Sequence, residues 1–106
     1  MKTLTLLSNQ ELHTQTKKAA TSEKAATVIL LEHLAEVESR RLYALYGKPS
    51  LWEYVKTELS YSDSQTFDRI NAMRLMVKVP TIKSNLENGS LSLTATAKLG
   101  SFVRKE

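Results

Sequence analysis

The chain has 106 residues and a formal net charge of +4 at pH 7, with three Gly, two Pro and no Cys. Its length fits a single domain, 1–106, with one core. So few Gly and Pro exclude a turn-rich all-β fold, and the absence of Cys excludes a disulfide scaffold, an iron–sulfur cluster, a thiolate zinc site and a Cys nucleophile. No apolar run approaches the roughly 20 residues of a membrane span. We therefore expect a soluble, cytoplasmic protein with no membrane partner.

The first helix is predicted within 1–21, an N-terminal helix with its lead-in. Ser8 and Glu11 have the spacing of a capping box, which starts a helix at about Asn9 and runs it to about Ala20. Thr21 or Ser22 can then cap a second, longer helix within 22–47. It is expected from Glu23 to about Tyr46, ending at Gly47.

The long helix is amphipathic in pattern. One stripe is expected to consist of Leu30, Leu31, Leu34, Leu42 and Leu45, and the opposite face of Glu32, His33, Glu36, Arg40 and Tyr43. Glu38 and Arg41 fall on the leucine side, which predicts a partly buried ion pair between them. A buried Glu38 acting as a catalytic acid is the alternative, but no His, second acid or metal cluster accompanies it.

A pair of helices is predicted within 50–78. Ser50 and Glu53 are predicted to form a capping box that starts a short helix from about Leu51 to Ser60, and Ser62 and Gln65 to form another that starts a helix from about Asp63 to Val77. Two or three residues at Ser60-Tyr61-Ser62 join them, as in a helix-turn-helix. Trp52 and Tyr54 are interpreted as core anchors, with base stacking as the alternative.

The region 80–106 is expected to hold two further helices. One begins at Pro80 and stops at Asn88-Gly89, and the other begins at Ser92 and is weakened by Gly100. The fold class is therefore all-α, a compact bundle of about five to six helices containing a helix-turn-helix-like pair.

Catalytic and metal-binding patterns are missing from the sequence. His13 and His33 lie on different predicted helices, and no HExxH, GxSxG, GxxxxGK[ST] or GxGxxG motif is present. We expect no enzyme activity, no metal and no cofactor for these 106 residues.

The second helix of the pair carries side chains suited to double-stranded DNA. Its core face is expected to be Phe67, Ile70, Met73, Met76 and Val77, and its polar face Ser64, Gln65, Asp68, Asn71 and Ala72. Gln65 and Arg69 can read base edges, while Ser62, Ser64 and Thr66 suit phosphate oxygens. Ser64, Gln65, Thr66 and Arg69 are expected to face the groove, although the helical angle of Thr66 turns it toward the core side. Phosphate attraction is expected from Lys56, Lys78 and Lys83. Asp68 opposes this reading unless it pairs with Arg69 or accepts from a cytosine amine.

Two resemblances favour DNA binding. The run Tyr61-Ser62-Asp63-Ser64-Gln65-Thr66-Phe67-Asp68-Arg69-Ile70, with the later Val79-Pro80 and Gly89-Ser90-Leu91-Ser92-Leu93, resembles the helix-turn-helix region of ParB-type partition proteins. The segments 30–43, 49–54 and 68–75 resemble the helical domain that precedes HNH nuclease domains in a group of bacterial proteins. These resemblances imply a DNA-binding helical domain, either the DNA-positioning part of an HNH-nuclease-type protein or a free-standing relative. The HNH segment is absent from this sequence, so no nuclease role is implied for its residues.

A protein-interaction or oligomerisation module without nucleic-acid binding is the alternative. The first predicted helix has a thin apolar stripe, with Leu7 and Leu12 ahead of a polar stretch, and it can pack on its own domain or on a second copy as a homodimer.

Overall fold

The computed structural model describes residues 2–104, and this part of the chain is helical, with no strand. The all-α prediction is confirmed. The elements are η1 (Lys2–Leu6), α1 (Asn9–Arg40), α2 (Leu42–Leu45), α3 (Leu51–Glu58), α4 (Asp63–Lys78), α5 (Ile82–Asn88) and α6 (Leu93–Arg104).

Helix α1 is one continuous helix, so the expected break at Thr21 or Ser22 is wrong. The capping box of Ser8 and Glu11 is present. No Pro or Gly interrupts the sequence from residue 9 to residue 40, and the Thr21 hydroxyl donates to the Lys17 carbonyl at 3.1 Å instead of capping a new helix. The boundary between 1–21 and 22–47 therefore lies inside a helix.

Helix α1 ends earlier than Gly47, the predicted stop. Arg41 adopts the left-handed conformation with φ 52° and ψ 40°, and its amide donates to the Glu38 carbonyl. The chain then makes the single turn of α2, in which Leu45 is 80% exposed. The bend at Arg41 breaks the predicted leucine stripe before Leu42 and Leu45 can continue it.

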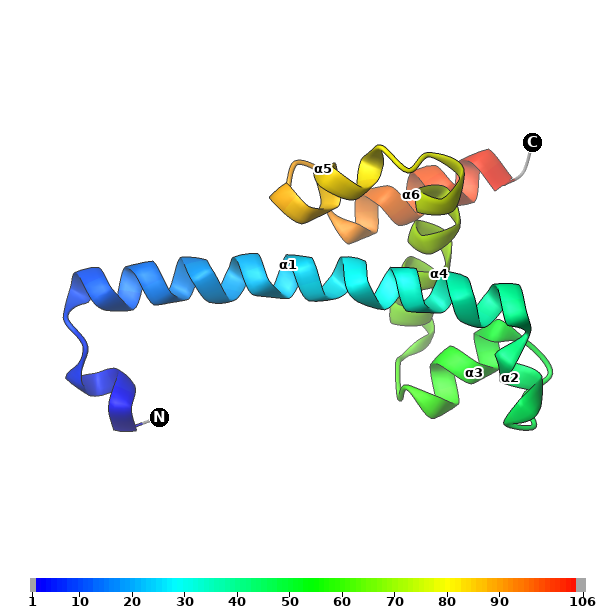
Figure 1. The fold of residues 1–106 in the computed structure, drawn as a ribbon, viewed down its shortest axis with the longest axis horizontal. Coiled ribbons are helices and arrows are strands. Elements are labelled where there is room, and N and C mark those ends of the chain that lie inside the picture. The colour runs from blue at the N-terminus through cyan, green and yellow to red at the C-terminus, as the bar shows by residue number, and fades with distance from the viewer. Residues whose placement is uncertain (1, 105–106) are drawn as a thin grey trace.

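The N-terminal half of α1 projects from the bundle as an arm, defined here as residues 9–23. All of these residues are exposed, and Figure 1 shows this part of α1 extending alone with η1 at its end. The principal extents of the molecule are 50 × 30 × 21 Å. The remaining part of α1 and helices α2 to α6 form the compact bundle.

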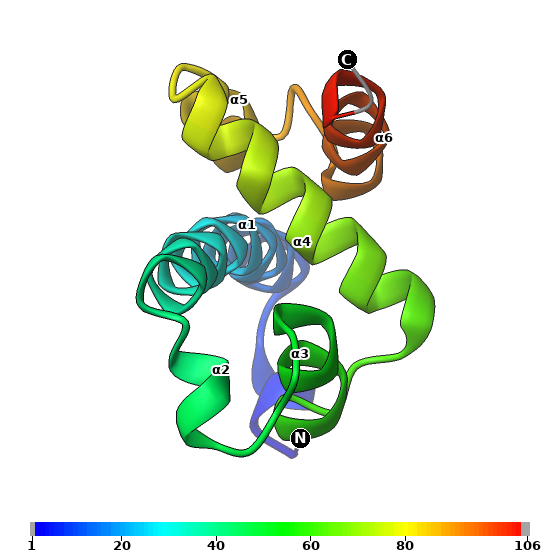
Figure 2. The same cartoon turned by 90° about the vertical axis from the view of Figure 1, so that its right-hand side faces the viewer.

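Helix α4 lies at the centre of the bundle. It packs on α1, α3 and α6, and Figure 2 shows it crossing α1, with α3 and α6 on opposite sides. The main core consists of Val28, Leu31, Leu34, Leu51, Val55, Ile70, Ala72, Met73, Met76 and Leu86. Trp52 and Tyr54 pack against this core, as predicted, and so does Tyr43, which was expected on the opposite face.

The contact between α4 and α6 buries a second face of α4. Asn71 and Ala72, expected to point outward, are buried, while Phe67 and Val77, expected in the core, are 38% and 57% exposed. A Cβ atom at Gly100 would collide with the carbonyl oxygen of Asn71 and lie 3.2 Å from the Leu75 Cβ. Gly100 thus permits the close approach of α6 to α4. The hydrophobic pattern of α4 alone does not reveal this contact.

The predicted boundaries of the last two helices are close to those observed. Helix α5 begins at Ile82, two residues after Pro80, and ends at Gly89, which has a left-handed φ of 83°. The Ser92 hydroxyl accepts a hydrogen bond from the Ala95 amide at the start of α6. Within residues 2–104, no helix combines the length and the apolar character that crossing a membrane requires.

Candidate nucleic-acid interface

The α3–α4 pair predicted from the sequence is present. Helix α3 ends at Glu58 and α4 begins at Asp63, so four residues join them, with Ser60 in the left-handed region at φ 59°. The Ser50 hydroxyl accepts from the Glu53 amide at 3.1 Å, which confirms Ser50 as the cap of α3, but the Glu53 side chain does not return a bond to the Ser50 amide to complete the expected capping box. The connection is one or two residues longer than expected.

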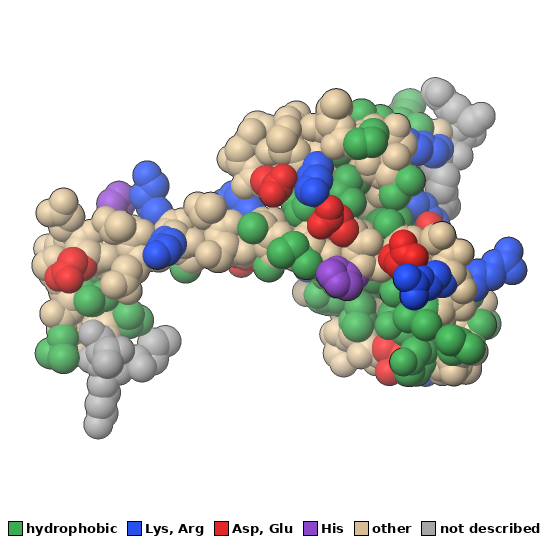
Figure 3. Space-filling model, viewed as in Figure 1, with side chains coloured by type: hydrophobic (Ala, Val, Ile, Leu, Met, Phe, Trp, Pro, Cys, Tyr) green, Lys and Arg blue, Asp and Glu red, His purple; other side chains and the backbone are tan. Residues whose placement is uncertain are grey.

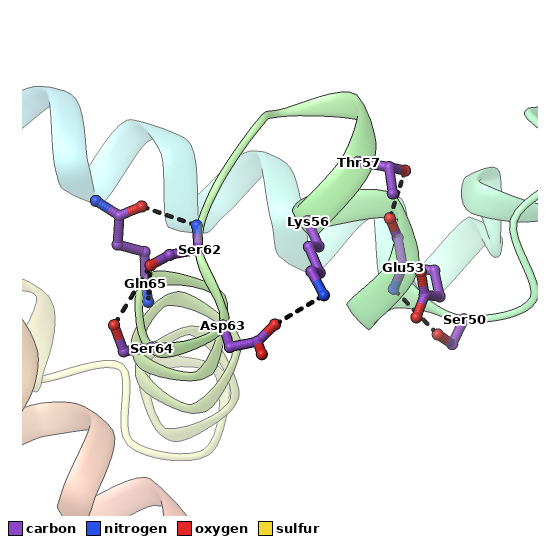
Figure 4. A network of polar contacts seen from close by, with 8 residues as sticks. All are labelled: Ser50, Glu53, Lys56, Thr57, Ser62, Asp63, Ser64 and Gln65. Carbon is purple, nitrogen blue, oxygen red and sulfur yellow. Dashed lines mark hydrogen bonds and ion pairs between the residues drawn. The ribbon is translucent and has the colours of Figure 1, made fainter.

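The first turn of α4 is exposed and polar. The Ser62 hydroxyl accepts from the Gln65 amide at 3.2 Å, and the Gln65 side-chain oxygen accepts from the Ser62 amide at 2.9 Å. Ser64 lies beside Ser62, with 3.3 Å between the hydroxyl oxygens (Figure 4). The capping box therefore fixes the direction of Gln65, whose side-chain nitrogen is not used by the box.

Thr66 does not belong to this exposed surface. Its exposed fraction is 0%, and its hydroxyl has no hydrogen-bond partner among the described residues. The expectation that Thr66 faces a DNA groove is wrong, because the close packing around α4 covers this side of the helix.

Arg69 is held by two contacts within the α4 region. Its Nη1 donates to the Gln65 carbonyl at 3.1 Å, and its guanidinium carbon lies 4.3 Å from the centre of the Tyr61 ring. Asp68 instead accepts from the Thr94 hydroxyl at 3.3 Å and does not pair with Arg69, which was one of the two arrangements that would reconcile Asp68 with DNA binding. Successive residues of a helix point about 100° apart, which leaves Asp68 facing α6 and Arg69 facing Tyr61.

Two of the three predicted phosphate-binding lysines are already in ion pairs. Lys56 lies 3.0 Å from Asp63, as Figure 4 shows, and Lys83 lies 2.7 Å from Glu32. Hydrogen bonding to these carboxylates raises the pKa of both lysines above the ordinary value of 10.5. Lys78 is exposed and has no ion-pair partner in the described chain.

The predicted pair of Glu38 with Arg41 is replaced by another. Glu38 binds Arg74 of α4, with Arg74 Nη2 2.6 Å from Glu38 Oε2. Arg41 instead ends α1 in the left-handed conformation, and its side chain is exposed. The contact between Glu38 and Arg74 joins α1 to α4 and is partly buried, as expected for Glu38.

Tyr61 and Thr94 are the site residues that the sequence analysis did not identify. Tyr61 precedes the α4 cap and holds Arg69, while Thr94 comes from α6 and holds Asp68. Because Tyr61 lies outside α4, helical periodicity gives only a weak indication that Tyr61 contacts Arg69. Thr94 offers none, since its place depends on the packing of α6 against α4.

Other chemistry and the comparisons add no further site. Within residues 2–104, no cluster of three His, Cys, Asp or Glu side chains could hold a metal ion. No family model matches the chain, and no curated protein or solved structure is found to match it.

Proposed function

We propose that the chain binds double-stranded DNA, with the first turn of α4 in the major groove. The observation that carries the proposal is the exposed, capped first turn of α4 on a helix whose middle is fixed by α1, α3 and α6. A rigid support is what a reading surface requires, because base contacts depend on precise side-chain placement. The role agrees with the one implied by the resemblance to ParB-type and HNH-preceding helical domains.

Gln65 and Arg69 have specific hydrogen-bonding capacities in this arrangement. Adenine recognition by Gln uses both its amide oxygen and its amide nitrogen. The Gln65 oxygen already accepts from the Ser62 amide, whereas the two hydrogens of its side-chain nitrogen are not used by the capping box, so the closed box favours Gln65 as a donor to base-edge acceptors such as guanine O6 and N7. Arg69 has donors only, which suit a backbone phosphate oxygen as well as such a base-edge acceptor.

The test is a fluorescence anisotropy titration of labelled duplex DNA over a salt series. We expect affinity to fall as salt rises, because phosphate contacts release counterions. A dissociation constant that stays in the millimolar range at low salt, or an affinity that does not change with salt, would refute the proposal.

The sharpest variant is Gln65→Glu. Glu at this position can keep the capping box with Ser62, but it removes the amide donor and adds a charge that DNA repels. We expect at least about tenfold weaker binding with an unchanged melting temperature, corresponding to about 1.4 kcal/mol. Arg40→Gln is the matched control, since Arg40 is an exposed cation paired with Glu36 on α1.

A protein-interaction role is the second candidate, and the arm favours it. No other element within residues 2–104 covers its 15 residues, and Leu4, Leu6 and Leu12 near its end are 42%, 84% and 42% exposed. Hydrophobic side chains are also visible at this end in Figure 3. Sedimentation distinguishes the candidates: a tight dimer without DNA affinity supports the second, and a DNA-binding monomer supports the first.

A further inference from the structure

A pocket with a volume of about 390 Å³ lies where α1, α4 and α5 meet the start of α6. Its polar lining comes from Glu23, Lys24, Thr27, Arg69 and Ser92. Arg69 connects this pocket to the first turn of α4, because the Gln65 carbonyl one turn earlier accepts from its guanidinium. The pocket therefore adjoins the surface proposed to read DNA.

Lys24 is positioned in this pocket by Gly89. A Cβ atom at Gly89 would lie 2.9 Å from the Lys24 Cε and 4.0 Å from its Nζ, so the lysine stem passes over the bare glycine backbone. Gly89 also has a left-handed φ of 83°, which disfavours a side chain there. Lys24 is half-buried, and no ion pair with another described residue satisfies its charge.

Arg69 is the second cation of the pocket and also lacks a carboxylate partner among the described residues. Its Nε is buried and makes no hydrogen bond there, although Nη1 donates to Gln65 and the guanidinium stacks on Tyr61. Lys56, Arg74 and Lys83, by contrast, are each paired with an acidic side chain. Glu23 is the one carboxylate in the pocket lining, against two cations.

We propose that this pocket binds a backbone phosphate of the DNA duplex between Lys24 and Arg69. A phosphate supplies acceptors for the Lys24 ammonium and the Arg69 guanidinium, and it neutralises two partly buried charges that have no carboxylate partner among the described residues. This inference rests on the proposed DNA binding and adds a sequence-independent contact beside the reading turn. The contact would fix the orientation of α4 on the duplex.

The test compares Lys24→Gln with Lys98→Gln in the full chain. Lys98 is an exposed lysine of α6 that does not line the pocket. Losing one phosphate contact should reduce the slope of log affinity against log salt by about 1 and weaken binding to all duplex sequences alike. Melting temperatures of both variants establish that each is folded.

A second measurement separates the source of the phosphate. Inorganic phosphate is titrated into isotope-labelled protein at constant ionic strength, and the amide signal of Gly89 and the Nε signal of Arg69 are followed. We expect both signals to shift in the wild type and not in Lys24→Gln. Phosphate binding without any DNA binding would overturn the DNA backbone as the source.

The two proposals fail in different ways. If the duplex binds but Lys24→Gln keeps the wild-type salt slope, the pocket is not a phosphate site and the DNA-binding proposal stands. If neither the duplex nor inorganic phosphate binds, both proposals are wrong.

Discussion

Arg74 of α4 binds Glu38 of α1 through two nitrogens. Nη2 lies 2.6 Å from Oε2, and Nε lies 3.3 Å from Oε1 and 3.2 Å from Oε2. The residues are 36 positions apart in sequence. This pair therefore adds a polar contact to the apolar packing of α1 against α4, the helix that carries the reading turn.

Glu38→Gln should destabilise the protein because it removes the charge from this two-nitrogen contact. The side chains of Arg74 and Glu38 are 33% and 34% exposed, so solvent screening limits the expected loss to about 1 kcal/mol. Urea unfolding measured by Trp52 fluorescence gives the change. Glu36→Gln breaks an exposed pair with Arg40 and should cost less than about 0.5 kcal/mol. Equal losses in the two variants would contradict this account.

Gly100→Ala should destabilise the protein although Ala is the better helix former. The added methyl group meets the Asn71 carbonyl oxygen, and separating α6 from α4 should cost about 1–3 kcal/mol. Thermal unfolding measures the loss. Ser22→Ala raises helix propensity on the exposed arm without such a contact and should leave the protein equally or slightly more stable. A Gly100→Ala protein as stable as the wild type would show that α6 does not approach α4 so closely.

Thr66→Val should raise stability by up to about 1 kcal/mol. The substitution keeps the shape of a fully buried side chain and removes a hydroxyl that has no partner among the described residues. Chemical unfolding measures the gain, and the same protein should bind duplex DNA as the wild type does. A large loss of stability would reveal a hydrogen bond at this hydroxyl.

The start of α1 should loosen in acid. The Ser8 amide, which donates to the Glu11 carboxylate, lowers the pKa of Glu11 below its ordinary value of 4.5. A lowered folded-state pKa means that this contact stabilises the helix start above pH 4.5 and is lost as pH falls through the lower, folded value. The protection of the first-turn amides, measured as the exchange rate relative to the intrinsic rate at each pH, should therefore fall as pH drops below 4.5 through the lowered pKa of Glu11. Glu11→Gln retains a capping box without a titratable group, so its exchange should lack this pH-dependent change in protection.

Glycine substitutions should separate the arm from the bundle. Ala19→Gly with Ala20→Gly should lower the helical circular dichroism signal while leaving the unfolding midpoint of the bundle nearly unchanged, because both residues are exposed. Ala35→Gly lies where α1 packs on the core and should lower the midpoint. A lower unfolding midpoint in both the arm variant and the Ala35→Gly variant would mean that the arm and the bundle unfold as one unit.

The sequence predicted helix starts better than helix ends or buried faces. Ser8, Ser50 and Ser62 were identified as caps because a capping pattern is local, and each acts on residues within one turn. Thr21 is also a residue type that can cap a helix, but its hydroxyl donates to the carbonyl of Lys17 in its own helix. The residue type alone does not reveal which of these two roles it takes. Arg41 ends α1 in a conformation that most side chains avoid, so Gly47 was the more natural stop.

The sequence predicted the exposed residues in the first turn of α4, but not the residues of other elements that contact this helix. The exposure of Ser64 and Gln65 followed from the periodicity of α4, whereas the burial of Asn71 depends on α6, which comes from about 25 residues later in the chain. The same limit applies to ion pairs. Glu38, Lys83 and Lys56 bind partners on other helices, so charge patterns within one helix could not assign them.

The length of the arm magnifies small movements at its base. Its 15 residues rise about 1.5 Å each, so the arm reaches about 20 Å beyond the bundle as a rod without Pro or Gly. By simple geometry, a bend of about 10° at its base would move the tip by about 4 Å, a displacement close to the spacing of two packed side chains. Small adjustments where α1 enters the bundle are thus magnified at the leucine-bearing end of the chain.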